Sequence, residues 1–182
     1  MSERIETNLG EYDNSWYKPG NSFKRCCWYI INSVFFKSSL FPFSKLKVLL
    51  LQLFGASAGK NILIKPCVNI KYPWFLSVGN NVWIGEKVWI DNLGKVVIGN
   101  NVCLSQESML LSGNHDYTQT GFNLIVKEII LEDGVWIGAR SVVCGGVVCR
   151  NHAVLAVNSV ATRDLEPFSV YQGNPAQKVK ER

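Results

Sequence analysis

The sequence has little histidine, no CxxC pair and no long apolar run, and each shortage excludes a class of protein. Two histidines in 182 residues are too few for a zinc site built on three histidines, so we expect no metal centre. The six cysteines lack metal-binding or redox spacing, which favours reduced, mostly buried thiols. The apolar run CCWYIINSVFF ends well short of the ~18 residues that a transmembrane helix needs.

The composition is that of one folded domain, since 47% of the residues are hydrophobic and 18% are charged. The polar start, MSERIETNLGEYDNSW, lacks the basic and then apolar pattern of a secretory signal, so we expect a cytoplasmic protein. A formal charge of +5, with Lys and Arg scattered along the chain, does not favour nucleic acid as a partner. A small polyanionic ligand or an acidic membrane surface fits this charge as well.

The N-terminal third divides into a polar arm, residues 1–21, and a helical segment, residues 22–58. In the second half of this segment Ser44 is the expected N-cap and Gly55 the expected stop. The helical spacing predicts an apolar stripe between them, formed by Leu46, Leu49, Leu50 and Leu53.

Two interpretations of residues 23–54 stay open, and they are compatible. In the first, a pair of helices packs on the main domain. In the second, part of their surface rests on a membrane, with apolar side chains in the interface and cations near anionic headgroups. The cations at the fringe are Lys24, Arg25, Lys37, Lys45 and Lys47.

A six-residue repeat occupies residues 59–166. A period of six fits neither a helix nor a single strand and is the signature of a parallel β-helix. Six residues form one strand and one corner, and three such units form a triangular coil whose marked residues point inward. The expected inward positions are Ile64, Ile70, Val78, Ile84, Ile90, Ile98, Leu104, Leu110, Leu131, Ile137, Val143, Cys149, Leu155 and Ala161.

Several segments carry a resemblance to a known family. VWIGEKVWIDN, VIGNNV and GVWIGARSVV, with NPA near the end, resemble the left-handed β-helix acyltransferases of the hexapeptide-repeat superfamily. Within it, the chain is similar to the maltose, galactoside and nodulation O-acetyltransferase branch. Through WIDNLGKVVIGNNVCLSQ, NHDYT and LIVKEIILEDGVWIGA it is most similar to colanic-acid-type exopolysaccharide acetyltransferases. The resemblance covers residues 20–182 and implies left-handed coils, an acetyl-CoA donor and homotrimers with active sites between neighbouring prisms.

The repeat is interrupted at length over residues 111–130, so we expect a loop there that leaves the prism. His115 lies at its start, after Gly113 and Asn114, which suit a tight turn, and the resemblance places the family's catalytic histidine here. An imidazole can remove the proton of an attacking sugar hydroxyl, which typically accelerates a reaction by ~10²–10⁴. The sequence contains no GxSxG motif, which would indicate a covalent intermediate. We therefore expect direct transfer with His115 as general base.

Three further polar residues are candidates for acceptor binding. Asp116 could orient the histidine or contact sugar hydroxyls, but an Asx-type turn residue is the alternative. Asp91 and Asn92, at the WIDN corner, either bind the acceptor or serve corner geometry. The maltose and galactoside enzymes carry an asparagine in the coil before the histidine, where this chain has Gly85, so their specificity is not carried over.

The donor site follows from the resemblance, which points to the later coils and the C-terminal basic tail, residues 167–182. Cations suit a ligand with several phosphate charges, although two tail lysines could also simply aid solubility. The residues that match CoA-lining positions, or lie close to them, are Trp136, Ala139, Val157, Thr162 and Arg163, with Lys178 and Lys180 in the tail.

These observations predict an acetyl-CoA-dependent O-acetyltransferase that modifies a sugar hydroxyl in surface polysaccharide synthesis. We expect a saccharide acceptor, which could be free, nucleotide-linked or lipid-linked, and an enzyme that is cytoplasmic or peripheral at the inner membrane. Xenobiotic (streptogramin-type) and serine acetyltransferases share the architecture, but the match through the N-terminal helices argues against both. A non-enzymatic scaffold is a further alternative, although it would have no reason to keep a histidine in an extruded loop.

Overall fold

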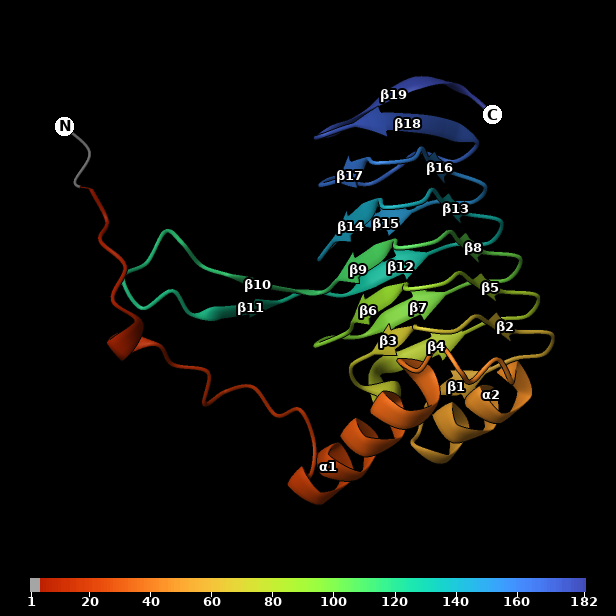
Figure 1. Ribbon diagram of the computed structural model, residues 1–182. Helices are drawn as coiled ribbons and strands as arrows, with labels where there is room; N and C mark the ends of the chain where they lie inside the picture. Colours follow the sequence, from red (N-terminus) through yellow and green to blue (C-terminus); the bar gives the residue numbers. More distant parts are fainter. Residues whose placement is uncertain (1–3) are drawn as a thin grey trace.

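The computed structural model describes residues 4–182 and shows a triangular prism of stacked coils with two helices across one end (Figure 1). Each coil gives one short strand to each of three parallel sheets, which is the predicted left-handed parallel β-helix. The first sheet contains β1 (Ser57–Ala58), β4 (Leu76–Val78), β7 (Val96–Ile98), β12 (Ile129–Leu131) and β15 (Val148–Cys149).

The other two sheets complete the prism. The second contains β2 (Leu63–Ile64), β5 (Trp83–Ile84), β8 (Cys103–Leu104), β13 (Trp136–Ile137), β16 (Val154–Leu155), β18 (Ser169–Gly173) and β19 (Ala176–Glu181). The third contains β3 (Asn69–Ile70), β6 (Trp89–Asp91), β9 (Met109–Leu111), β14 (Val142–Cys144) and β17 (Val160–Ala161).

The core of the prism is the column of inward aliphatic residues that the repeat predicts. Ile64, Ile84 and Leu104 pair in register across three coils, and each is at most 1% exposed. All fourteen predicted inward positions are buried. Because each fully buried aliphatic side chain contributes about 1.5–3 kcal/mol, this column stabilises the stack strongly.

The corners between strands require left-handed backbone at residues that are not glycine. Asn61, Asn81 and Asn101 occupy the same corner in successive coils, each with φ of 57°. Asparagine tolerates this conformation better than most residues. Their side-chain amides also bond from one coil to the next, at 3.1 and 3.2 Å, so the strained corners are tied into a ladder.

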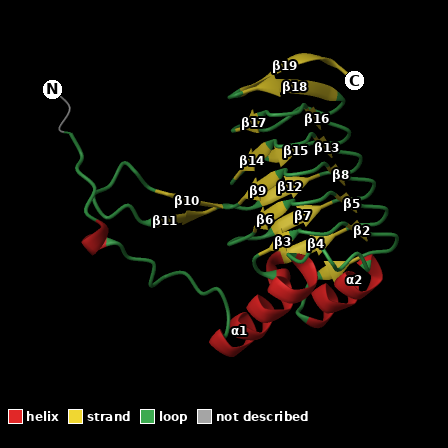
Figure 2. Ribbon diagram, viewed as in Figure 1, coloured by secondary structure: helices red, strands yellow, loops and turns green. Residues whose placement is uncertain are grey.

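Helices α1 (Ser22–Ile31) and α2 (Ser44–Leu53) lie across the N-terminal end of the prism, and α1 continues into the π-helical turn η2 (Asn32–Phe36) (Figure 2). Trp28 of α1 is buried and donates its Nε1 hydrogen to the carbonyl of Ile70, at 2.8 Å. This bond fixes the helix against the first coil. No helix within residues 4–182 has the length and apolar character to cross a bilayer.

The start of α2 corrects one prediction. Phe43 occupies the N-cap position, and Ser44 is the first helical residue. The Ser44 hydroxyl instead accepts from the backbone N–H of Ile64 at 3.0 Å and donates to its carbonyl at 3.1 Å. These two bonds anchor the helix to β2. Gly55 follows the helix with φ of +98°, as expected of a stop.

Two segments depart from the stack. Strands β10 (Gly113–His115) and β11 (Leu124–Val126) form an antiparallel hairpin inside the predicted loop, and it projects from the prism (Figure 1). The N-terminal arm, with the short helix η1 (Leu9–Glu11), runs beside the hairpin tip. Another short helix, η3 (Pro73–Phe75), precedes β4.

Residues 167–182 are not a separate tail. Strand β18 pairs in parallel with β16, and β19 folds back antiparallel to β18, so this segment closes the C-terminal end of the second sheet. Ser169, Val170 and Tyr171 alternate between buried and half-buried, which is what a strand in this position requires.

Candidate active site

The hairpin carries His115 at the outer end of β10. The start of the hairpin is held in place by Ser112, whose hydroxyl donates to the Asp91 carbonyl (3.0 Å) and accepts from the Gly94 N–H (2.9 Å). A Cβ at Gly113 would meet the end of the Leu93 side chain, which would have to move to admit it.

The imidazole of His115 is held by Phe122 from the far side of the hairpin. Its Nδ1 lies 2.9 Å from the Phe122 carbonyl oxygen, and the two rings stack with centroids 4.5 Å apart and planes 4° apart. A carbonyl can only accept a hydrogen bond, so Nδ1 must carry the hydrogen. Nε2 of the neutral ring is therefore left with a free lone pair, which is the form a general base needs.

The N-terminal arm completes the surroundings of His115. The Asn8 N–H donates to the Thr120 carbonyl, and the Asp13 N–H donates to Asn123 Oδ1, both at 2.8 Å. These bonds bring the ring of Tyr12 to 5.8 Å from the His115 ring. No periodic pattern in the arm marks Tyr12, whereas Phe122 could have been noticed as an aromatic residue in a polar loop.

The arm is also anchored near the prism. The Tyr17 hydroxyl donates to the Leu93 carbonyl at 2.7 Å. Burial, reinforced by the neighbouring Tyr72 and Asp91, raises the pKa of the Tyr17 phenol well above its ordinary value. The phenol therefore stays protonated and keeps this bond across the physiological range.

Asp116 and Asn92 occupy structural positions. Asp116 Oδ1 accepts from the N–H and hydroxyl of Thr118, which is the Asx-type turn alternative, and the histidine ring is oriented by Phe122 and not by Asp116. Asn92 is fully buried, and its amide bonds both the N–H and the carbonyl of Tyr72. This corner role leaves Asn92 no exposed atom for an acceptor, which corrects the binding hypothesis for that residue.

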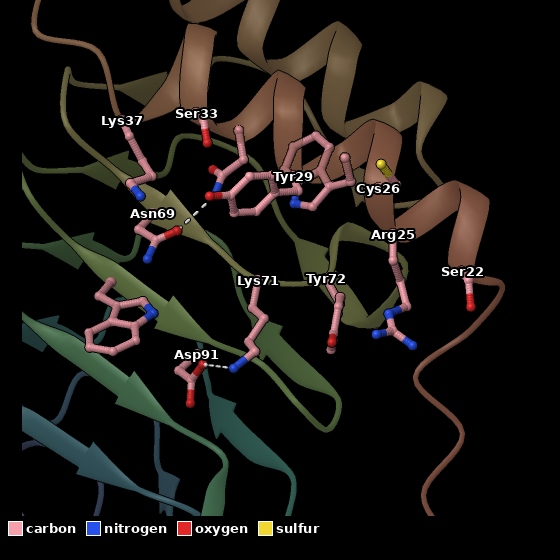
Figure 3. Close-up of a pocket in the computed structure, with 13 residues that line it drawn as sticks. Ser22, Arg25, Cys26, Tyr29, Ser33, Lys37, Asn69, Lys71, Tyr72 and Asp91 are labelled. Carbon is pink, nitrogen blue, oxygen red and sulfur yellow. Dashed lines mark hydrogen bonds and ion pairs between the residues drawn. The ribbon is translucent and has the colours of Figure 1, made fainter.

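Asp91 instead lines a pocket of about 490 Å³ between α1 and the third sheet (Figure 3). Lys71 Nζ forms an ion pair with Asp91 Oδ1 at 3.2 Å, and this oxygen is buried and accepts no hydrogen bond. The pocket mixes aromatic, cationic and polar groups, which suits a ligand with apolar ring faces and hydroxyl edges. Its lining includes Arg25, Tyr29, Lys37, Asn69, Tyr72 and Trp89.

A second hollow, of about 320 Å³, lies at a corner of the prism and brings together two of the predicted donor residues. Ala139 and Val157 line it from adjacent coils, joined by the bond from the Asn158 N–H to the Ala139 carbonyl, at 2.9 Å. Arg140, which sequence reasoning missed, lines it too and pairs with Glu107 at 2.7 Å. The Arg140 bond, with that of Lys87, lowers the pKa of the Glu107 carboxyl.

The remaining predicted donor residues lie around this corner and beyond it. Trp136 is 47% exposed and donates its Nε1 hydrogen to Ser105 Oγ at 2.9 Å. Thr162 and Arg163 are exposed after β17. In β19 Lys180 is exposed, whereas Lys178 bonds Glu166 and Glu181, at 2.7 and 2.8 Å, which raises the pKa of its ammonium group. Lys178 is therefore already paired.

One chain does not bring His115 to the corner hollow. The hairpin leaves the prism after β9, at the corner between the third and first sheets (Figure 1). The hollow of Ala139 and Val157 lies directly after β13 and β16, at the corner between the second and third sheets. Within one chain, His115 and the hollow are therefore at different corners of the prism.

Comparison with known proteins decides the family. No protein-family model matches the chain. However, the chain is 32% identical over 166 residues to the "Putative colanic acid biosynthesis acetyltransferase WcaF" of Escherichia coli, with 91% of each chain covered. This chain belongs to the hexapeptide-repeat acetyltransferases. It is an acetyltransferase enzyme, as predicted, which decides against the scaffold alternative.

Other relatives agree with this assignment. The galactoside O-acetyltransferase of Escherichia coli is 27% identical over 130 residues, which cover 69% of this acetyltransferase and 64% of the relative. Among solved structures, the hexapeptide-repeat acetyltransferase VCA0836 of Vibrio cholerae has a TM-score of 0.76 at 24% identity, over 87% and 90% of the two chains. A maltose O-acetyltransferase from Clostridium difficile has a TM-score of 0.74 at 22% identity, over 87% and 86%. Both structures confirm the fold.

Proposed function

We propose that this acetyltransferase moves an acetyl group from acetyl-CoA to a hydroxyl of a saccharide during exopolysaccharide synthesis in the cytoplasm. The observation that carries the proposal is the fixed tautomer of His115, whose Nδ1–H donates to the Phe122 carbonyl and leaves Nε2 free. The WcaF relative supports the polysaccharide context, and a VCA0836 structure complexed with acetyl-CoA supports the donor.

In the proposed reaction His115 acts as a general base and then as a general acid. Nε2 takes the proton of the sugar hydroxyl while the hydroxyl oxygen attacks the thioester carbonyl. The tetrahedral intermediate then breaks its C–S bond, and the CoA thiolate leaves with the proton from Nε2. The O-acetyl sugar and CoA–SH are the products, and no covalent acetyl-enzyme is formed.

We further propose that the active enzyme is a homotrimer with each site built from two subunits. Within one prism, the hollow of Ala139 and Val157 lies at the corner before the third-sheet strands, and the hairpin carrying His115 leaves at the corner after them. In a closed ring the hairpin of each subunit reaches the hollow of the next. Trp136, Thr162, Arg163 and Lys180 are then available to the CoA moiety, because all four are exposed.

For the acceptor we propose the pocket beside Asp91. The side chains of Lys71 and Asp91, which are 41% and 16% exposed, can bond sugar hydroxyls, and the rings of Tyr72 and Trp89 can lie against the apolar face of a sugar. Crystal structures of AntD, an N-acyltransferase from Bacillus cereus, are complexes with dTDP or with a dTDP-linked amino sugar, which supports testing nucleotide-linked sugars here. Lipid-linked saccharides are the other acceptor class to test.

The test measures thiol release from acetyl-CoA with a panel of free, nucleotide-linked and lipid-linked saccharides. We expect His115→Ala to lower kcat by ~10²–10⁴ while the KM for acetyl-CoA stays near that of the wild type. Tyr117→Ala, two residues further along the hairpin and exposed, is the control and should keep its activity. The proposal is wrong if no hydroxyl acceptor is turned over, or if His115→Ala matches the wild type.

A further inference from the structure

The outward face of α1 is apolar. Trp28 points into the core, whereas Phe23, Ile30 and Val34, which lie on the opposite side of the helix and its η2 extension, are 78%, 56% and 53% exposed. A surface helix normally turns its apolar side toward the core and polar residues toward solvent, so an apolar outward face is unusual. Nothing within residues 4–182 covers this stripe.

The outward face of α2 is more unusual, because its polarity is inverted. Lys47 points inward, is fully buried and donates to the Lys65 carbonyl at 2.9 Å. Leu46, Leu49 and Leu53 point away from the prism and are 37%, 50% and 70% exposed. The loop between the helices continues this surface with the exposed Leu40 and Phe43.

The charge around these helices is of one sign. From Asn14 to Gly85 the sequence contains nine Lys and Arg residues and no Asp or Glu, although the whole chain has fourteen acidic residues. Lys and Arg are scattered along the whole chain, whereas Asp and Glu are absent from the stretch of sequence that forms its helical end. Lys37 and Lys45 are exposed beside the apolar side chains.

We propose that this helical-end surface, made of Phe23, Ile30, Val34, Leu40, Phe43, Leu46, Leu49 and Leu53, docks on an anionic lipid bilayer. Exposed apolar side chains between lysines, on a stretch of chain without Asp or Glu, match a lipid surface, where the side chains enter the interface and the ammonium groups meet phosphates. A protein partner would not require the exclusion of every acidic residue over this length of chain.

Docking would place the proposed acceptor pocket close to the bilayer. The pocket is on the inner side of α1, between this helix and the first coils, and Arg25 and Lys37 line it from α1 and the residue after η2 (Figure 3). If the proposed function holds, this geometry favours a saccharide whose lipid carrier stays in the membrane. The docking itself does not depend on that function.

The experiment measures binding of the full chain to vesicles by flotation, without any catalytic readout. One set of vesicles contains phosphatidylglycerol in phosphatidylcholine, and the other contains phosphatidylcholine alone. We expect at least ~10-fold tighter binding to the anionic set, reduced by high salt, because each lysine near the surface contributes about 1 kcal/mol. Leu49→Glu should weaken binding by ~10-fold or more, because it removes one leucine side chain that the proposed docking buries in the lipid interface.

The matched control is Val179→Glu, which adds the same charge at an exposed apolar position of β19, at the opposite end of the prism. It should bind vesicles like the wild type, and thermal unfolding should show that both variants are folded. Absence of wild-type binding, or an equal loss in both variants, overturns the proposal. If light scattering shows that Leu49→Glu only dissociates a larger assembly, the surface is an interface between copies and the proposal fails.

Discussion

His115 and Phe122 are in direct contact, although they are seven positions apart in the sequence. Phe122 has φ of +50°, in the left-handed region that non-glycine residues rarely adopt. This backbone conformation lets one residue present both its ring and its carbonyl oxygen to the imidazole. Strained backbone of this kind often accompanies a functional site.

The pairing predicts the effect of removing the Phe122 ring. Phe122→Ala keeps the carbonyl but removes the stacked surface, so the imidazole loses its fixed orientation. We expect kcat to fall by about 10–100-fold, with little change in the KM for acetyl-CoA. Phe122→Tyr retains the ring and should stay close to the wild type in the same steady-state assay. Equal kcat values for Phe122→Ala and the wild type would show that stacking does not position His115.

The sequence predicts His115 but not its partners, and the reason is physical. The histidine stands out because it follows a break in a regular repeat. Phe122 and Tyr12 are brought to it by hairpin register and by arm contacts, and neither leaves a periodic pattern. Asn92 is the opposite case. It stands out in the sequence as a polar residue at a coil corner, but its side-chain amide hydrogen-bonds the backbone of Tyr72.

At the scale of elements, α2 shows what periodicity leaves open. The leucine spacing correctly predicts a helix, but it does not tell which apolar side faces the prism. The structure turns Lys47 and Leu51 inward and Leu49 outward, because the Lys47 ammonium satisfies the Lys65 carbonyl at the end of the first coil. A buried amine in such a place must affect stability as pH changes.

The pH dependence follows from the direction of the shift. Burial lowers the pKa of Lys47 below its ordinary value of 10.5. Between the lowered folded value and 10.5 the unfolded chain binds more protons, so the free energy of unfolding rises with pH in that window. Lys47→Met lacks this group. We therefore expect the wild type to gain stability relative to Lys47→Met as pH rises from neutral toward 10.5.

Urea unfolding of both proteins at several pH values measures this difference. Lys45→Met, on the exposed side of the same helix, controls for the loss of one positive charge. A stability difference between wild type and Lys47→Met that does not change with pH would contradict the lowered pKa.

For the whole molecule, the repeat determines the stack but not the assembly. Fourteen inward residues at a six-residue spacing predict the prism, because each buries its side chain only against the coils above and below. Contacts between copies leave no such period in one sequence. His115 and the hollow of Ala139 lie at different corners of one prism, which supports the proposed shared site.

Subunit mixing tests the shared site directly. His115→Ala leaves the hollow intact, and Ala139→Trp fills the hollow while leaving the hairpin intact. Each variant alone should be inactive. After co-expression, a site regains activity when the hairpin comes from one variant and the hollow from the other, which random mixing gives at about a quarter of sites. If hairpin and hollow of the same chain form the site, mixed assemblies stay as inactive as their parents, and light scattering of each sample excludes loss of assembly as the cause.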